Sequence, residues 1–325
     1  MRLCVATVVL TCLLVPTMRA EAQGLRQECE VVQNSNYRLL CQNVADALEI
    51  VQPRLGIVLS GGNPVPWTAS TLGMRLGSLP RLSLAARVTA APIDLPAIER
   101  AASDSDVEFG VASIAADASV GVFPGFALGP TVGGFGALDV LGSVGMVPLP
   151  GDEGFQDKSP FTWAAGARLG LLRESFTAPG VSLSAMYRAL GDISYGNVET
   201  GLIGGEGDTF FRVSEYYVTS LRGVVGKRLL GFGLTAGAGY DWYRGDVLIR
   251  VRDPSLTTPN RIREIQQDGV KTNRTSLFAN ASYTFLLVSV VAEGGWQQGG
   301  DAVVGATDKL EKSALFGGIA IRIGL

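Results

Sequence analysis

The sequence predicts an all-β protein, a closed antiparallel transmembrane β-barrel of about 12 strands that is preceded by a short N-terminal helix. Three observations lead to this fold class: a dispersed apolar excess, an alternation of short and long connections, and the pattern of the last fourteen residues. Strand boundaries inferred from one sequence shift by a few residues, so counts of ten to fourteen strands fit the same pattern.

The composition is too apolar for an ordinary soluble domain. Hydrophobic residues make up 47% of the chain and charged residues 18%, whereas soluble domains carry about 25% charged residues. Beyond the N-terminus no stretch is apolar over the roughly 18 residues that a membrane helix requires. The apolar residues are spread through short alternating segments instead, which is the pattern of a membrane barrel.

The C-terminal segment 312–325 alternates strictly. Large apolar residues occupy one parity, and small or charged residues occupy the other, with Phe316 as the bulky exception. Successive side chains of a strand point to opposite faces, so this strand has one apolar side. Its free edge would promote aggregation in water, whereas closure of a barrel removes the edge. A soluble edge strand would give the same pattern for this segment alone.

Residues 1–22 have the pattern of a signal peptide. Met1–Arg2 precedes the apolar run Leu3–Pro16, and Ala20–Glu21–Ala22 supplies a cleavage site of the A-x-A type. We therefore expect cleavage after Ala22. An uncleaved anchor is the alternative, but the run is too short to span a bilayer.

Residues 23–53 are predicted to form a disulfide-closed helical segment. In an exported chain, Cys29 and Cys41 indicate one disulfide, and closing so small a loop stabilises by about 3 kcal/mol. A redox or metal pair is disfavoured by the spacing and by the absence of His. Helical spacing of apolar residues predicts a helix over 37–51, which Asn36 caps and Pro53 ends. Its role is either a periplasmic lead-in or a plug at the barrel mouth.

The barrel is predicted over 54–325, with short connections alternating with long ones. Strands are expected near 54–61, 70–78, 81–91, 112–123, 135–147, 161–172, 179–190, 210–226, 232–244, 274–286, 288–297 and 312–325. Short links lie near 78–80, 173–178, 227–231 and 286–287, and long ones lie at 92–111, 148–160, 191–209, 245–273 and 298–311. Short turns are periplasmic and long loops external in such barrels. The even strand count then places both termini in the periplasm.

Charged residues occur on the parity that faces the barrel interior. The candidate lumen-lining residues are Arg75, Arg87, Arg168, Arg188, Arg212, Arg222, Arg322, Asp117, Asp139, Asp241 and Glu293. Buried charge must be paired or hydrated. One interpretation is therefore a network of ion pairs that fills the lumen. The other is a water-filled or gated passage whose basic excess favours anionic or amphipathic solutes. Four acids of the N-terminal segment, Glu28, Glu30, Asp46 and Glu49, would complement the surplus arginines.

The chain has no His, which excludes a Ser-His-Asp arrangement and any His-dependent metal site. We expect no catalytic residue, no cofactor and no metal. A sequence pI near 5.2 in an exported chain disfavours nucleic acid as a partner.

The architecture of 54–325, and most specifically the C-terminal strand, resembles bacterial outer-membrane β-barrel proteins, although Leu325 stands where Phe is more usual. The helix ahead of the barrel is weakly similar to the plugged hydrophobic-compound transporters of that group. The known barrel enzymes, which are phospholipases, lipid A acyl-modifying enzymes and omptin proteases, rely on a histidine that this chain lacks. The resemblance implies the outer membrane of a Gram-negative cell, with the lipid bilayer and the barrel-assembly machinery as partners.

The sequence thus predicts a porin-like passive channel or transporter for small solutes, with a basic lumen. The alternative is a non-conducting structural or surface-interaction barrel with a salt-bridge-filled interior.

Overall fold

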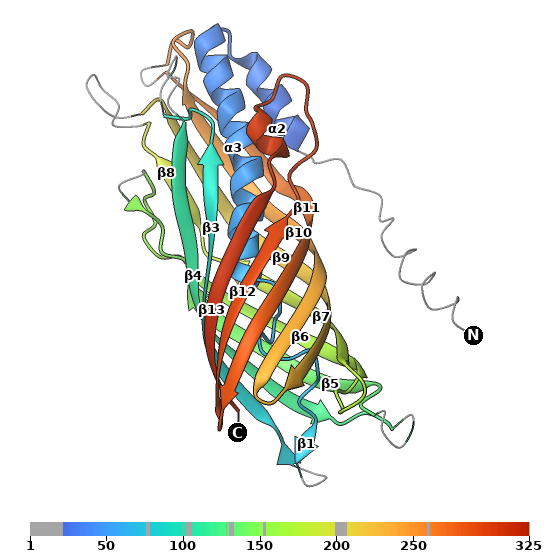
Figure 1. Ribbon diagram of the computed structural model, residues 1–325. Coiled ribbons are helices and arrows are strands. Elements are labelled where there is room, and N and C mark those ends of the chain that lie inside the picture. The colour runs from blue at the N-terminus through green and yellow to red at the C-terminus, as the bar shows by residue number, and fades with distance from the viewer. Residues whose placement is uncertain are drawn as a thin grey trace.

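Ten strands of the described chain close into an antiparallel barrel, and a long N-terminal helix lies within it (Figure 1). The computed structural model describes residues 22–75, 79–99, 101, 106–127, 129, 133–151, 154–198, 207–258 and 261–324. The predicted fold class is confirmed, with the strand count at the lower end of the expected range. The predicted signal peptide falls almost wholly outside the described residues, as does Leu325. No helix among these residues has the length and apolar character needed to cross a membrane.

The wall runs in sequence order around the barrel. Its strands are β3 (Leu82–Leu95), β4 (Val107–Phe123), β5 (Ala137–Met146), β6 (Phe161–Leu172), β7 (Gly180–Leu190), β9 (Thr209–Leu229), β10 (Phe232–Arg252), β11 (Ile262–Phe285), β12 (Val288–Gln297) and β13 (Ala314–Gly324). The elements outside the wall are α2 (Ala22–Glu28), η1 (Cys29–Val31), α3 (Ser35–Ser60), β1 (Met74–Arg75), β2 (Leu79–Pro80), β8 (Ile193–Gly196) and η3 (Asp308–Glu311). The last strand, β13, pairs with the first, β3, and this pairing removes both edges.

The two faces of the wall differ as the alternation predicts. In β13, Ile319, Ile321 and Ile323 are exposed on the outer face, whereas Phe316 is buried inside. The predicted exception is thus a space-filling ring in the lumen. Phe278, the bulky exception of β11, is also buried inside, next to Gly62. Both aromatic exceptions therefore fill the interior rather than break the pattern.

A charge on the outer face should destabilise the protein in lipid. Ile319 is 65% exposed in the middle of β13, and an arginine at the bilayer midplane of a barrel costs about 2–4 kcal/mol. We expect Ile319→Arg to lower the free energy of unfolding in liposomes by that amount, measured by urea titration. Leu39→Arg is the control, because Leu39 is exposed on α3 near the start of that helix. An equal loss in both variants would contradict the lipid-facing assignment.

The two ends of the barrel differ in their connections. The turns Leu230–Gly231 and Leu286–Leu287 and the end of β13 lie at one end, called here the tight-turn end (Figure 1). The opposite end, called here the long-loop end, carries the connections 96–106, 147–160, 191–208, 253–261 and 298–313. The hairpin of β10 and β11 extends far into this end, so the loop predicted over 245–273 is shorter than expected. The short strand β8 pairs with the part of β9 that lies there.

Four predictions about the N-terminal part are wrong. The predicted strand 54–61 belongs to α3, which does not end at Pro53 but runs to Ser60. The predicted strand 70–78 is not part of the wall: β1 pairs only with β2 within the described chain, and 76–78 lie outside it. The N-terminus of α3 lies at the long-loop end, opposite the end of β13, so the two described ends are not on the same side (Figure 1).

Candidate functional site

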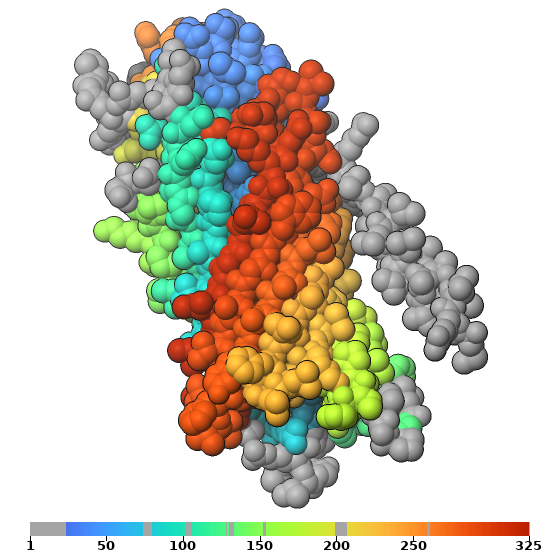
Figure 2. All heavy atoms as spheres, in the orientation of Figure 1, coloured from blue at the N-terminus to red at the C-terminus, as the bar shows by residue number. Residues whose placement is uncertain are grey.

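The lumen is occupied by the protein's own chain. Every residue of α3 from Val44 to Ser60 is buried, and so is each residue of 61–73, called here the lumen segment. Figure 2 shows the N-terminal helices at one end of the molecule, with the wall strands covering most of α3 below them. Because 61–73 is irregular, its buried peptide groups need partners outside regular secondary structure.

The N-terminal part of α3, at the long-loop end, is held by a disulfide and by polar contacts. The predicted disulfide Cys29–Cys41 is confirmed, and it ties η1 to α3. Asp46 pairs with Arg26 at 2.6 Å and also accepts from the Thr307 backbone N–H. Of the four acids expected to complement the lumen arginines, only Glu49 reaches a wall arginine in the described chain. That partner is Arg274, 3.8 Å away, which the sequence analysis did not select.

Polar side chains of the wall bind backbone carbonyls of α3 around Pro53, which lies inside this helix. A proline inside a helix removes one hydrogen bond and disturbs the preceding turn. Gln297 Nε2 donates to the Pro53 carbonyl at 3.1 Å, and the Tyr216 hydroxyl donates to the Gln52 carbonyl. Arg54 donates to the Lys312 carbonyl at 2.7 Å. The barrel thus supplies partners that an isolated helix would lack.

The lumen segment is held by buried ion pairs of the wall that also bind its backbone, called here clamps. The first clamp is the pair of Arg222 with Asp241. Arg222 Nη1 lies 2.8 Å from Asp241 Oδ1, and both side chains are at most 1% exposed. Arg222 also donates to the carbonyls of Gly61 and Gly62, at 3.3 and 3.1 Å. An ion pair of the wall is therefore used to bind the backbone of the lumen segment.

Glu293 and Arg87 hold the next peptide groups. Glu293 accepts from the backbone N–H groups of Gly62 and Asn63, at 2.7 and 2.9 Å. Arg87 donates to the Asn63 carbonyl at 3.1 Å and pairs with Asp117 at 2.8 Å. Carboxylates thus meet N–H groups and guanidinium groups meet carbonyls, so each charged group has the right polarity for its backbone partner.

Arg168 and Asp139 form the third clamp, nearer the tight-turn end. These residues are register partners on β5 and β6, pair at 2.7 Å and are fully buried. Arg168 donates to the Thr68 carbonyl at 3.2 Å, and Asp139 accepts from the Leu72 backbone N–H at 3.0 Å. The lumen segment is therefore bound at both ends.

The other predicted lumen residues differ in placement. Arg322 lies over the Trp67 ring, 3.4 Å from its centroid. Arg188 is 3% exposed, and its Nε and one terminal nitrogen have no hydrogen-bond partner in the described chain. Arg75 lies in β1, outside the barrel wall, and its side chain is outside the described set.

The placement of Arg212 in the lumen is wrong. Its side chain is exposed and stacks on Phe210. A bulge at Glu215 explains the error, because the register with β10 shifts between Arg244 and Asp246. On the C-terminal side of this bulge, even-numbered residues of β9 such as Arg222 face inward. On its N-terminal side, odd-numbered residues such as Val213 face inward. One extra residue thus reverses the two faces.

The polar residues through which 61–73 is held were not predicted from the sequence. Asn63, for example, accepts from the Val65 N–H and donates to the Thr68 carbonyl. The available signal was the run of Ser, Gly, Asn, Pro and Thr residues in 60–71, which lacks any alternation. That composition is typical of a loop, and only its complete burial distinguishes it from one.

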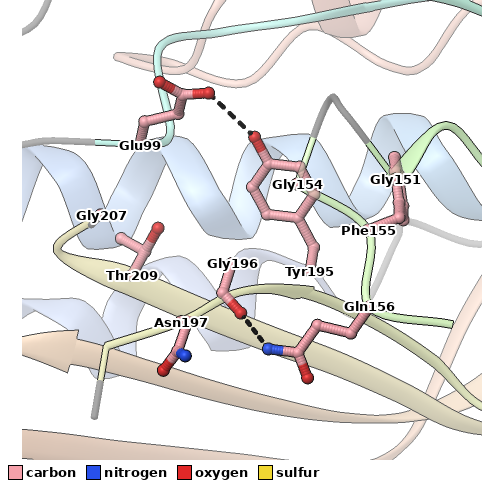
Figure 3. A pocket seen from close by; sticks show the side chains of 10 residues that line it. All are labelled: Glu99, Gly151, Gly154, Phe155, Gln156, Tyr195, Gly196, Asn197, Gly207 and Thr209. Carbon is pink, nitrogen blue, oxygen red and sulfur yellow. Dashed lines mark hydrogen bonds between the residues drawn. The ribbon is translucent and has the colours of Figure 1, made fainter. Parts of the chain in front are cut away.

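A separate cavity lies at the long-loop end (Figure 3). It has a volume of about 410 Å³, and its residues come from three of the long connections and the start of β9. The Tyr195 hydroxyl points to Glu99, and the Gln156 amide donates to the Gly196 carbonyl. No cluster of His, Cys, Asp or Glu that could hold a metal ion occurs in the described parts of the chain.

No protein-family model and no curated protein matches this chain. Solved structures similar to it include the translocator domain of autotransporter NalP from Neisseria meningitidis, with 10% identity, a TM-score of 0.42 and coverage of 86% of this chain and 96% of the other. The outer membrane protease OmpT from Escherichia coli has 16% identity, a TM-score of 0.36 and coverage of 76% and 96%. The transport unit of autotransporter AIDA-I from Escherichia coli has 10% identity, a TM-score of 0.36 and coverage of 85% and 99%.

Proposed function

We propose that the protein is a non-enzymatic, non-conducting outer-membrane barrel that binds its own N-terminal segment along the lumen and displays the disulfide-closed end of that segment outside the cell. The observation that carries this proposal is the use of buried wall charges as backbone ligands. Arg222, Glu293, Arg87, Arg168 and Asp139 each contact a peptide group of 61–73. Of the two functions that the sequence predicts, this supports the surface-interaction barrel with a filled interior.

The orientation follows from the connections. Short turns of outer-membrane barrels are periplasmic and longer loops are external, so the turn Leu286–Leu287 marks the periplasmic side. The disulfide Cys29–Cys41 and α2 lie at the opposite end, beside the connection 298–313 that Arg26 and Asp46 contact. The segment therefore enters the barrel from the periplasmic side and ends outside.

The charge distribution disfavours an open basic pore. A passage selective for anions needs arginines whose positive charge faces water. Here the guanidinium groups of Arg87, Arg168 and Arg222 are paired with carboxylates and occupied by backbone carbonyls. Because α3 is buried from Val44 to Ser60 and 61–73 is buried as well, these three arginines line no open passage in this state.

Conductance in planar bilayers tests the closed lumen. We expect the full chain to show no single-channel steps and a variant without residues 23–72 to show stable steps, because this deletion removes both α3 and the lumen segment. The matched control lacks only 23–33 and carries Cys41→Ser, and it should remain silent because α3 stays in place. Steady conductance of the full chain would contradict the proposal and restore the channel interpretation.

Surface labelling tests the orientation independently of conductance. Val31 is exposed at the end of η1, and Phe176 is exposed in the connection between β6 and β7 at the tight-turn end. On intact cells, a membrane-impermeant maleimide should label Val31→Cys but not Phe176→Cys. Labelling of the second variant alone would reverse the assignment and place the disulfide in the periplasm.

A further inference from the structure

A second cavity opens at the tight-turn end, between the lumen segment and the wall. Its volume is about 300 Å³, which is at the lower limit for small-ligand sites. Three arginines, Arg81, Arg228 and Arg322, contribute to its lining, whereas no Asp or Glu among the described residues does. The cavity is therefore positively charged, unlike the clamps deeper in the lumen, where each arginine faces a carboxylate.

The ring of Trp67 makes cation–π contacts with two of these arginines. The guanidinium carbon of Arg322 lies 3.4 Å from the centroid of the Trp67 ring, and that of Arg228 lies 5.2 Å away. Such cation–π contacts orient a guanidinium group without neutralising its charge. Arg322 also donates to the Ser83 hydroxyl at 2.9 Å, and Arg81 donates to the Leu72 carbonyl at 3.3 Å. Both partners are neutral, so these two arginines retain their full charge.

Arg228 is partly compensated from outside the cavity. It pairs with Glu174 at 3.0 Å, and this carboxylate does not line the cavity. The three arginines and Glu174 together leave a local surplus of positive charge. Like charges this close repel, and an anion between them would remove that repulsion.

Two further donors at the cavity lack partners. Trp67 Nε1 and Thr71 Oγ1 are buried, and neither has a hydrogen-bond partner within the described residues. Both residues line the cavity. An unsatisfied buried donor costs about 1–3 kcal/mol, but these two atoms are enclosed and do not face the open space of the cavity, so the three arginines are the groups available to a ligand there.

We propose that this cavity binds a phosphate group. A phosphate presents several acceptor oxygens, and guanidinium groups bind it through paired N–H donors. Free inorganic phosphate and the phosphodiester of a lipid headgroup share this chemistry. A lipid source is compatible with the rim, where Leu286 and Leu287 are exposed beside the cavity.

The bound phosphate would also link the two parts of the site. Trp67 and Thr71 belong to the lumen segment. Arg228 and Arg322 belong to wall strands, and Arg81 directly precedes the wall strand β3. Phosphate binding therefore adds a tie between the segment and the barrel at the end where α3 makes no contact. Its affinity is measurable without conductance, so a failure here leaves the proposed closed lumen intact.

The test uses the full chain in detergent micelles. Inorganic phosphate is titrated by calorimetry at constant ionic strength against a chloride blank. In a second arm, phosphatidylglycerol in the micelles is titrated, with the thermal unfolding midpoint as readout. Losing one charge-assisted contact should weaken binding about tenfold or more, so Arg81→Gln and Arg322→Gln should each show that loss. Arg212→Gln is the control, because Arg212 also stacks on a ring but at the long-loop end.

The outcomes distinguish a free-phosphate site, a lipid-headgroup site and the absence of a phosphate site. Binding of inorganic phosphate supports a free-phosphate site, and binding of phosphatidylglycerol alone supports a headgroup site. Arg322→Lys, which keeps a charge, guards against a folding defect in Arg322→Gln and should retain part of the affinity. The proposal is overturned if neither ligand binds above the chloride blank, or if Arg81→Gln and Arg322→Gln bind as tightly as the unchanged protein.

Discussion

Replacing Asp139 by Asn should destabilise the folded barrel by about 3–5 kcal/mol, because it leaves the guanidinium group of Arg168 buried without its counter-charge. Both side chains are at most 1% exposed, so water cannot replace the lost partner. The measurement is the free energy of unfolding in urea, followed by the gel mobility of the folded barrel in detergent. Glu30→Gln is the control, since its pair with Arg38 is exposed and 4.0 Å long and is expected to contribute about 1 kcal/mol or less.

The double variant Arg168→Met with Asp139→Leu tests whether this ion pair binds the backbone of the lumen segment or only fills space in the lumen. Removing both members of an ordinary buried pair is often neutral. Here the Leu72 N–H would lose its acceptor, and an unsatisfied buried donor costs about 1–3 kcal/mol. We therefore expect the double variant to be more stable than Asp139→Asn but still less stable than the unchanged protein. Full recovery would mean that the pair only fills space.

The wall of the barrel was predictable because lipid acts on every second residue independently. Ile319, Ile321 and Ile323 face outward whatever the rest of the chain does, and their alternation is visible locally. The disulfide was predictable for a similar reason, since Cys29 and Cys41 are close in sequence. In β9 the alternation of inward and outward residues failed at a bulge. The bulge at Glu215 reversed the faces of β9 and moved Arg212 outside.

The content of the lumen was not predictable in this way, because its contacts join distant parts of the chain. Gly62 is 231 residues from Glu293, its acceptor. Nothing near Gly62 in the sequence indicates that a carboxylate will satisfy its N–H. The charged wall residues were predictable but their partners were not, so two interpretations stayed open: these residues face each other, or they face water. Arg87, Arg168 and Arg222 face carboxylates and a peptide backbone.

The continuation of α3 through Pro53 has the same origin. A proline normally marks a helix boundary, and the local sequence therefore predicted an end there. Here the helix is buried inside the barrel, and Gln297 and Tyr216 of the wall bind the carbonyls of Pro53 and Gln52. Tertiary contacts thus override a local signal that would otherwise end the helix.

A side chain at position 56 should clash with Tyr243 and Tyr216 and weaken the packing of α3 in the lumen. A Cβ built on Gly56 would lie 2.0 Å from the Tyr243 ring and 2.8 Å from the Tyr216 hydroxyl. Both tyrosines are about 1% exposed and have no space to retreat. Tyr216 also binds the Gln52 carbonyl, so moving it breaks that hydrogen bond. Overpacking of a tight core typically costs about 1–3 kcal/mol for a methyl group, and more for a larger group.

We expect Gly56→Ala to lower the free energy of unfolding by about 3 kcal/mol and Gly56→Leu to expel the helix. Expulsion would appear as protease cleavage within 44–60, which is buried in the unchanged protein. Gly294→Ala is the matched control, because a Cβ there would meet no atom within 4 Å. Combining Gly56→Ala with Tyr243→Leu should recover part of the loss, since the smaller side chain frees the space that the methyl group needs. A Gly56→Leu variant that resists protease as well as Gly294→Ala does would show that α3 is not packed against these tyrosines.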